Sequence, residues 1–168
     1  MDMNRKIFIV PDVNRAQDLF LKETISQRVA MVLTTNRAQT EQLSKISSGK
    51  TANVCDISRS EKEQFLGEYV DLIGELNCQS QDPKRWCYSL LSKDYVSSPF
   101  YDDLFKVVCL INKIAELDPG IIVVVADSQR IASQVRVYCQ KSSMQIIMSG
   151  FKGSTALILS SLVRTAIS

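Results

Sequence analysis

Runs of purely apolar residues alternate along this chain with segments of helical, amphipathic spacing. The clearest run is Ile121-Ile122-Val123-Val124-Val125, five β-branched residues without polar alternation. Such a run is typical of a strand that is covered on both faces in a parallel sheet. Asp127-Ser128 follows and can cap a helix by accepting hydrogen bonds from its first free N–H groups. Strand, polar turn and helix together make half of a βαβ unit.

The same alternation predicts five strands separated by helices. We expect strands at Lys6–Val10, Val29–Thr35, Thr51–Ile57, Gly120–Ala126 and Met144–Ser149. We expect helices from Arg15 to about Arg28, Asn36 to Ser48, Ser58 or Ser60 to about Leu76, Phe100 to Leu117, Gln129 to Lys141, and Ser154 to Ser168. Strands that alternate with helices favour a parallel sheet over a meander.

The expected fold class is therefore α/β: a three-layer, Rossmann-like domain with a mostly parallel five-stranded sheet and helices on both faces. Residues 1–150 form this domain. Residues 151–168 form a carboxyl-terminal helix without a stop signal, which we interpret as a docking helix or as the start of a linker to a missing second domain. Asn14 is expected to cap the first helix and Gly49 to end the second.

Length and composition agree with one globular domain. A chain of 168 residues can bury roughly 70% of the surface that its unfolded form exposes. Its net charge of +2 does not favour nucleic acid as a partner. It contains no run of about 20 apolar residues and no secretory signal pattern, so we expect a cytoplasmic protein without a membrane span.

The cysteines and the lack of histidine restrict the chemistry. The odd count and wide spacing predict reduced, mostly buried thiols at Cys55, Cys78, Cys87, Cys109 and Cys139. Without histidine, Ser-His-Asp and Cys-His catalysis and histidine-ligated zinc are excluded. A carboxylate, lysine or tyrosine would have to carry any proton transfer, and we expect neither a metal nor a cofactor.

Polar residues that follow the predicted strands are the first candidates for a site. In open α/β sheets, ligands bind at the carboxyl ends of strands where the strand order reverses, here between the first and fourth strands. The candidates are Asp12 and Asn14, Thr35 and Asn36, Asp56 and Ser58, Asp127 and Ser128, and Ser149 and Gly150. Each can also be a plain helix cap or turn residue. The first turn lacks glycine, which argues against a dinucleotide or P-loop site.

A second candidate is the segment Lys84–Tyr95, which carries the only tryptophan. Trp86 and Tyr88 lie there with Arg85 and Lys93. Aromatic and basic side chains together can stack on and pair with a sugar or a nucleotide. The alternative is a long connection whose aromatic side chains cover the edge of the sheet.

Several of these segments resemble the amino-terminal region of bacterial surface-polysaccharide (capsule or O-antigen) biosynthesis proteins. Those proteins are classed as glycosyltransferases of the GT-B type, with two Rossmann domains. The similar segments are Tyr69–Leu76, Trp86, Ser89–Asp94, Ser98–Tyr101 and Leu104. In that group, a tryptophan segment leads to a Lys-Asn or Lys-Asp pair and a Ser-Pro-aromatic helix start. The resemblance extends from Ile7 to about Ser149.

The resemblance implies an acceptor-side domain that is incomplete as a catalyst. Its partners would be a sugar or glycolipid acceptor and a second domain that carries the nucleotide-sugar site; peripheral membrane association fits such an acceptor. It implies acceptor-side or structural roles for Lys93 and Asp94. An inverting transferase would use an aspartate as catalytic base, for which the candidates are Asp12, Asp94 and Asp127. The ligand-binding candidates are Asn14, Asn36, Trp86, Lys93 and Ser128.

Two alternatives remain. The first is a non-catalytic, Rossmann-like interaction or small-ligand-binding module that docks through its last helix, at Leu157, Leu162 and Val163. The second is a small nucleotide-binding enzyme, which the absence of a glycine-rich loop disfavours.

Overall fold

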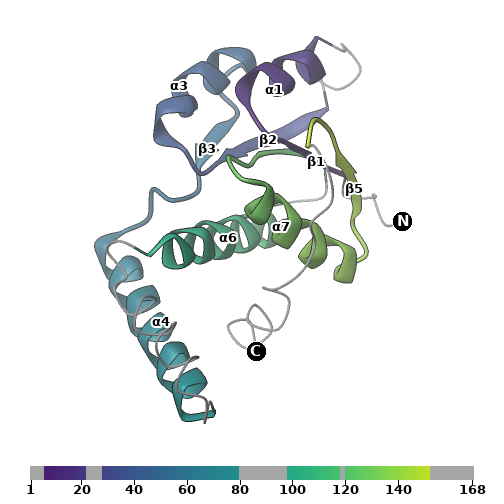
Figure 1. Cartoon of the computed structure of the whole chain (residues 1–168). Coiled ribbons are helices and arrows are strands. Elements are labelled where there is room, and N and C mark those ends of the chain that lie inside the picture. The colour runs from purple at the N-terminus through teal and green to yellow at the C-terminus, as the bar shows by residue number, and fades with distance from the viewer. Residues whose placement is uncertain (1–5, 22–27, 80–97, 118–119, 152–168) are drawn as a thin grey trace.

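The computed structural model describes residues 6–21, 28–79, 98–117 and 120–151 (Figure 1). Strands and helices alternate along these residues. In chain order they are β1 (Lys6–Val10), α1 (Val13–Phe20), β2 (Val29–Thr34), α3 (Arg37–Ile46), β3 (Thr51–Asn53), α4 (Arg59–Gln79), α6 (Pro99–Glu116), β4 (Ile121–Val125), α7 (Gln129–Lys141) and β5 (Gln145–Met148).

The strands form one parallel sheet of five strands in the order β3-β2-β4-β1-β5. The predicted α/β class and parallel sheet are thereby confirmed. The β-branched run forms β4, the central strand, and Val123 aligns with Phe8 of β1 on one side and Val32 of β2 on the other. Ile122 to Val125 are almost fully buried, as the absence of polar alternation predicts.

Helices cover both faces of the sheet (Figure 1). Helices α1 and α3 lie above it, and α6 and α7 lie below. Side chains alternate between these two layers because successive residues of a strand point to opposite faces. Ile7 and Ile9 belong to the core on the α6–α7 side, whereas Phe8 and Val10 belong to the core on the α1–α3 side.

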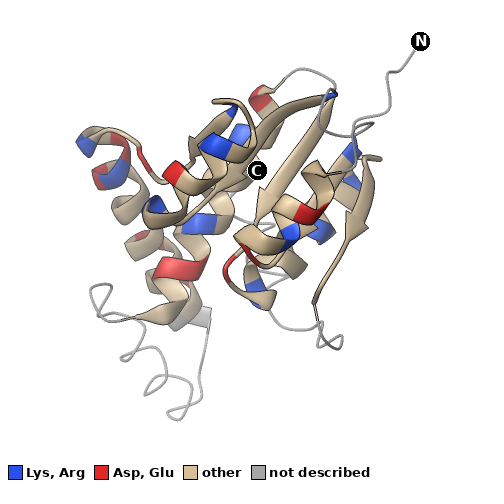
Figure 2. Ribbon diagram, turned by 90° about the horizontal axis from the view of Figure 1, so that it is seen from above, with Lys and Arg blue, Asp and Glu red and all other residues tan. Residues whose placement is uncertain are grey.

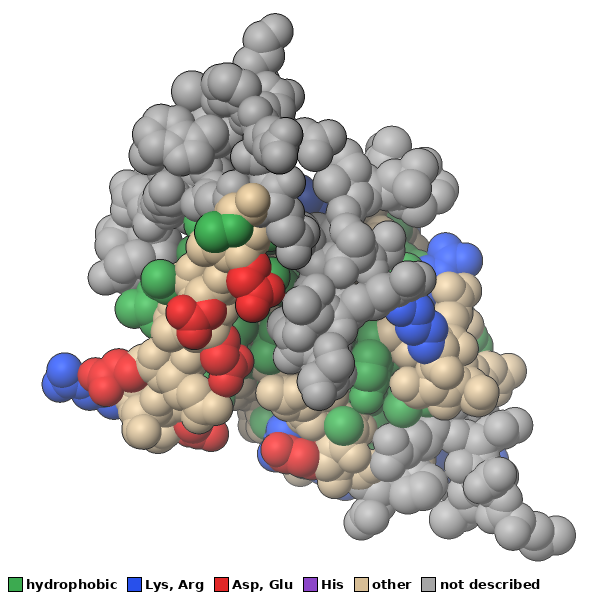
Figure 3. All heavy atoms as spheres, turned by 90° about the horizontal axis from the view of Figure 1, so that it is seen from below, with side chains coloured by type: hydrophobic (Ala, Val, Ile, Leu, Met, Phe, Trp, Pro, Cys, Tyr) green, Lys and Arg blue, Asp and Glu red, His purple; other side chains and the backbone are tan. Residues whose placement is uncertain are grey.

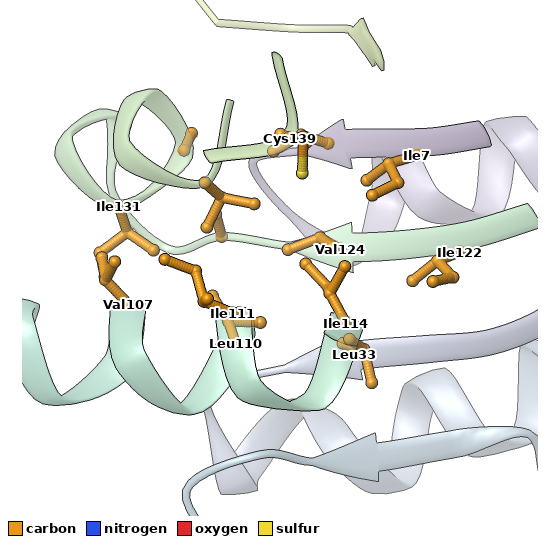
Figure 4. Close-up of a cluster of buried hydrophobic side chains, with 14 of the residues drawn as sticks. Ile7, Leu33, Val107, Leu110, Ile111, Ile114, Ile122, Val124, Ile131 and Cys139 are labelled. Atoms are coloured by element: carbon orange, nitrogen blue, oxygen red, sulfur yellow. The ribbon is translucent and has the colours of Figure 1, made fainter. Parts of the chain in front are cut away.

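Helix α6 packs its apolar face on the lower side of the sheet. Figure 4 shows its apolar face, Val107, Leu110, Ile111 and Ile114, against Leu33, Ile122 and Val124 of the sheet. Figure 2, a ribbon coloured by residue type, places the Lys, Arg, Asp and Glu positions mainly on helices and connections. In the described strands only Lys6 is charged. The sheet is therefore an apolar layer, and the polar chemistry lies around it.

Helix α4 projects away from the sheet and packs on α6 instead (Figure 1). Tyr69 and Ile73 of α4 and Leu104 of α6 are buried together. Phe65, Leu72 and Leu76 of α4 pack around this small core and are half-buried.

The strand order differs from that of the classical dinucleotide-binding sheet, in which β1 lies between β2 and β4. Here β4 lies between β2 and β1. The helices after β1 and β2 cover one face, and those after β3 and β4 cover the other. Neighbouring strands β1 and β4 therefore send their connections to opposite faces, which is the arrangement that opens a crevice at the carboxyl edge.

The predicted cap of the first helix and the predicted end of the third strand are wrong. Asp12, not Asn14, caps α1: its Oδ1 accepts a hydrogen bond from the Arg15 N–H at 2.9 Å, and Asn14 is an exposed residue inside the helix. Strand β3 ends at Asn53 and not at Ile57, because the Asn53 side chain accepts a hydrogen bond from the Cys55 N–H at 3.1 Å. This turn of the backbone takes the chain out of the sheet.

Other predicted helix ends are confirmed. Asn36 caps α3 and Ser128 caps α7. Gly49 follows α3 with a φ of +85°, a conformation that glycine adopts without steric cost. The predicted end of the first helix near Arg28 is wrong, since α1 ends at Phe20. The predicted last helix from Ser154 lies outside the described residues.

Candidate functional site

The carboxyl edge of the sheet brings together most of the described residues predicted for a site. Val10, Thr34 and Val125 are aligned across β1, β2 and β4. The residues that follow these strands therefore share one edge: Asp12 and Asn14, Asn36, and Asp127 and Ser128. Trp86, Lys93 and Asp94 lie outside the described residues, so their predicted roles stay predictions.

Most of these edge residues already serve the fold. Asp12 binds the Arg15 N–H, Asn36 Oδ1 accepts from the Ala38 N–H at 2.9 Å, and Ser128 Oγ accepts from the Ile131 N–H at 3.2 Å. These are helix caps, in agreement with the structural alternative that the sequence offered.

Asp127 takes part in a charge cluster with α6. The Lys106 ammonium donates to Asp102 at 2.8 Å and to Asp127 at 3.2 Å, and its side chain is only 20% exposed. Burial alone would lower the pKa of Lys106, but its hydrogen bonds to Asp102 and Asp127 outweigh burial and raise that pKa. The ammonium thus stays charged and holds the Asp127 carboxylate in place. The i, i+4 spacing of Asp102 and Lys106 on one helix is the feature of the sequence from which their ion pair could have been predicted.

A second ion pair lies beside this cluster. Arg130 of α7 approaches Asp103 of α6 at 3.6 Å, and the Asp103 side chain is 15% exposed. Burial raises the pKa of Asp103, and the neighbouring guanidinium compensates only in part. The carboxylate is therefore held in an unfavourable environment at neutral pH.

A hollow lies elsewhere, between the β3–α4 connection, α4 and α6. It is a pocket of about 520 Å³. Apolar side chains make up about half of its wall: Ala52, Val54, Ile57, Phe65, Phe105, Val108 and Cys109. The others are polar or charged: Asn53, Asp56, Glu61, Gln64, Glu68, Asn112, Lys113 and Glu116. Its size falls within the range of small-molecule sites.

The pocket is acidic. Four carboxylates, from Asp56, Glu61, Glu68 and Glu116, face one ammonium, from Lys113. That ammonium is already paired with Glu116 at 2.9 Å. Figure 3, which views the molecule from below, shows acidic side chains gathered on α4. The local field is therefore negative and disfavours phosphate and other anions.

Aromatic and amide groups complete the wall. The ring of Phe65 packs edge-on against Phe105, with ring centroids 5.1 Å apart, which fixes its orientation. The Gln64 side chain donates a hydrogen bond to the Glu68 carboxylate at 2.9 Å. This bond holds two polar side chains from adjacent turns of α4 together at the pocket wall. Asn112 is exposed on α6.

The sequence did not identify this pocket. Among the residues that line the pocket, only Asp56 was one of the site candidates that the sequence placed at the ends of strands. Phe65 and the polar residues of α4 that line the pocket belong to a segment that the sequence predicted only as a helix. Ser58, another candidate, caps α4: its Oγ accepts from the Glu61 N–H, and Glu61 in return accepts from the Ser58 N–H at 2.8 Å.

The prediction of mostly buried thiols is wrong for the four described cysteines. Cys139 is buried, but Cys55 and Cys109 are half-buried and Cys78 is exposed. Cys55 lies in the connection beyond the short strand β3, and Cys109 lies at the wall of the pocket. The number and spacing of the cysteines could not show that the segments around Cys55 and Cys109 border a hollow.

Two further properties concern the described residues. Within them, no group of three or more Cys, Asp or Glu side chains is arranged to hold a metal ion. None of the described helices has both the length and the hydropathy that crossing a membrane requires.

Comparison with protein-family models, with curated proteins and with solved structures found no match for this chain. The chemistry of the pocket and of the sheet edge is thus the basis for a functional hypothesis.

Proposed function

We propose that this chain binds an uncharged carbohydrate in the pocket between β3, α4 and α6, as the acceptor-side domain of a glycosyltransferase of surface-carbohydrate synthesis. The observation that carries the proposal is the composition of the pocket wall. Carboxylates and amides face the same space as an ordered aromatic ring. The resemblance to polysaccharide-biosynthesis proteins supports the same assignment from independent residues.

The polar groups of the wall suit hydroxyl groups. Ionised carboxylates accept hydrogen bonds, and amides both donate and accept. A sugar offers several hydroxyls and an apolar ring face. Glu68 and Asn112 project from different helices toward one space, so they can bind opposite edges of a ring while Phe65 contacts its face. The carboxylates make charge-assisted hydrogen bonds, which are the stronger kind.

The same wall argues against a nucleotide sugar at this position. A diphosphate would bring negative charge toward four carboxylates and an ammonium that is already paired. The donor would then bind to a second domain, as the acceptor-side role requires. The bond between acceptor and donor sugars would form at the junction of the two domains.

A second candidate is a non-catalytic small-ligand-binding module. The strand order favours it, because β4 separates β1 from β2 and the sheet thereby departs from the classical Rossmann order. In this case the pocket is the whole site, and the ligand is an uncharged or cationic small molecule.

A binding screen with one variant pair tests the proposal. Neutral oligosaccharides, UDP-, GDP- and CMP-sugars, and simple amines are titrated into the full chain, with thermal stability and heat of binding as readouts. A ligand at 100 times its dissociation constant adds about 2.7 kcal/mol to stability. We expect a shift with neutral oligosaccharides and none with nucleotide sugars.

The variants are Glu68→Gln and Glu63→Gln. Glu68 lines the pocket, whereas Glu63 is an exposed residue of the same helix outside that wall. Loss of a hydrogen bond to a charged group costs about 1.5–3 kcal/mol, so Glu68→Gln should weaken binding at least tenfold. Glu63→Gln should not change it. Binding of nucleotide sugars, or the absence of any thermal shift or heat of binding with every oligosaccharide, would contradict the proposed binding of an uncharged acceptor. Binding of amines alone would favour the second candidate.

A further inference from the structure

A second, smaller hollow lies between α4 and α6, next to the pocket; we call it the α4–α6 groove. Its volume is about 240 Å³, below the roughly 300 Å³ at which small-molecule sites begin. Buried and half-buried apolar side chains form its floor: Phe65, Tyr69, Leu72, Leu104 and Val108. Exposed carboxylates, all from α4, form its rim: Glu68, Asp71 and Glu75. A groove of this size accepts individual side chains of a partner rather than a whole small molecule.

Aromatic packing holds the floor of the groove in place. Phe65 lies edge-on to Phe105 with ring centroids 5.1 Å apart, and Tyr69 lies edge-on to Tyr101 with centroids 4.9 Å apart. Phe65 and Leu72 are nevertheless only half-buried, so part of this apolar surface faces solvent. An apolar surface that is already ordered loses little conformational freedom when a partner covers it.

The carboxylates of the rim lack the basic neighbours that pair with other acids of this chain. Glu41 and Glu63 each contact a Lys or Arg side chain four residues away, at 3.0 and 2.7 Å. Within the described residues, Asp71 and Glu75 form no ion pair. The segment of α4 from residue 63 to residue 79 contains no Lys or Arg. The field beside the apolar floor is therefore negative and attracts cations.

We propose that the α4–α6 groove docks a basic amphipathic helix of another protein. Such a helix carries an apolar stripe with Lys or Arg side chains beside it, and apolar stripes of this kind bind in apolar grooves. Its apolar side chains enter the groove, and its cations pair with Asp71 and Glu75. The inference goes beyond the proposed carbohydrate site, because these two carboxylates line the groove and not the pocket.

Charge decides among the occupants that such a groove can take. Symmetric pairing of two copies through this face would bring like carboxylates together, which is unfavourable. Anionic lipid headgroups and nucleic-acid phosphates are repelled for the same reason. The whole chain has a net charge of +2, so a cationic partner is attracted to this face and not to the molecule in general. Figure 3 shows acidic side chains beside hydrophobic ones on α4.

Three synthetic peptides of about 18 residues, or five turns of helix, test the docking to the full chain. The first carries Leu at spacings of three and four with Lys on both flanks. The second has the same composition in scrambled order, and the third has Glu in place of Lys. Binding is measured by the fluorescence anisotropy of the labelled peptides. We expect the first to bind about tenfold more tightly than the scrambled peptide, because only the first presents one apolar face. The third should not bind, and added salt should weaken binding of the first.

Two double variants locate the contact. Asp71→Asn with Glu75→Gln removes two carboxylates of the groove. Glu41→Gln with Glu63→Gln removes two exposed carboxylates that line neither hollow, so both variants change the net charge equally. Because exposed ion pairs contribute modestly, we expect the groove variant to bind the first peptide about 3- to 10-fold more weakly and the control to stay within about twofold of the parent. Circular dichroism and urea unfolding establish that both variants are folded.

Amide hydrogen exchange then places the bound peptide, which should slow exchange in residues 65–76 of α4. Equal weakening by the two double variants, equal binding of the scrambled peptide, or no binding of the first peptide would overturn the proposal. Sedimentation of the chain alone gives a further check. Self-association that Asp71→Asn with Glu75→Gln abolishes would assign this face to a second copy and contradict the proposed partner. Because the groove variant leaves the pocket wall unchanged, oligosaccharide binding is tested separately from peptide binding.

Discussion

The position of α4 decides whether the pocket exists as described, and one pair of alanine variants tests it. Ile73 and Val70 lie on the same helix, three residues apart. Ile73 is 6% exposed in the small core with Tyr69 and Leu104, whereas Val70 is 56% exposed. The two variants thus remove similar apolar groups from opposite environments.

The expected loss can be worked out from the groups removed. Ile73→Ala deletes three carbon groups, each worth about 0.8 kcal/mol when buried, which gives about 2.5 kcal/mol before any cavity effect. Measured Ile→Ala losses span about 2–5 kcal/mol. The core between α4 and α6 is small and can partly collapse, so the low end applies. Val70→Ala should change the free energy of unfolding by less than about 0.5 kcal/mol.

The assay is urea unfolding followed by circular dichroism, with the slope m compared between the proteins. For a chain of this size, 2.5 kcal/mol corresponds to a fall in Tm of about 5–10 °C. An unchanged m with the predicted loss means that α4 unfolds together with the sheet. Equal losses for the two variants, or a loss below about 0.5 kcal/mol for Ile73→Ala, would refute the packing of α4 on α6 and with it the pocket.

Two further predictions concern charge and capping. Burial raises the pKa of Asp103 in the folded state above its ordinary value of 3.8, so the ionised carboxylate destabilises the fold at neutral pH. Asp103→Asn should therefore stabilise the chain at pH 7, and the gain should shrink as the pH falls below 3.8. Urea unfolding across this pH range measures the gain, and a gain that grows as the pH falls would contradict the reasoning. Ser58→Ala removes the cap of α4 and should lower the free energy of unfolding by about 1 kcal/mol. Ser60→Ala, two residues further along the chain, should lower it much less in the same unfolding assay. Equal losses of stability in the two variants would contradict the capping role of Ser58.

The sequence predicted well those features that neighbouring residues determine. The β-branched run located β4 within a residue of its ends, and polar residues before helices identified the caps at Asn36 and Ser128. The first cap was misplaced because Asp12 and Asn14 are both good capping residues two positions apart. Local patterns cannot choose between such neighbours.

Features that depend on distant residues were not predictable in this way. Each apolar strand could pair with any other, so periodicity could not show that β4 lies between β1 and β2. The pocket is built by a strand end and two helices, and its polar wall looks like an ordinary solvated surface in the sequence.

The central place of β4 determines when the sheet can assemble. Both strands that pair with β1 lie beyond residue 120, and Ile121 aligns with Lys6 across 115 residues of chain. At about 5–20 residues per second, a ribosome adds that interval in roughly 6 to 23 seconds. During this time Ile7, Phe8 and Ile9 have no strand beside them, and closing so long an interval slows folding further. The late synthesis of β4 therefore leaves the apolar strand β1 exposed to non-native contacts until its neighbour has been made.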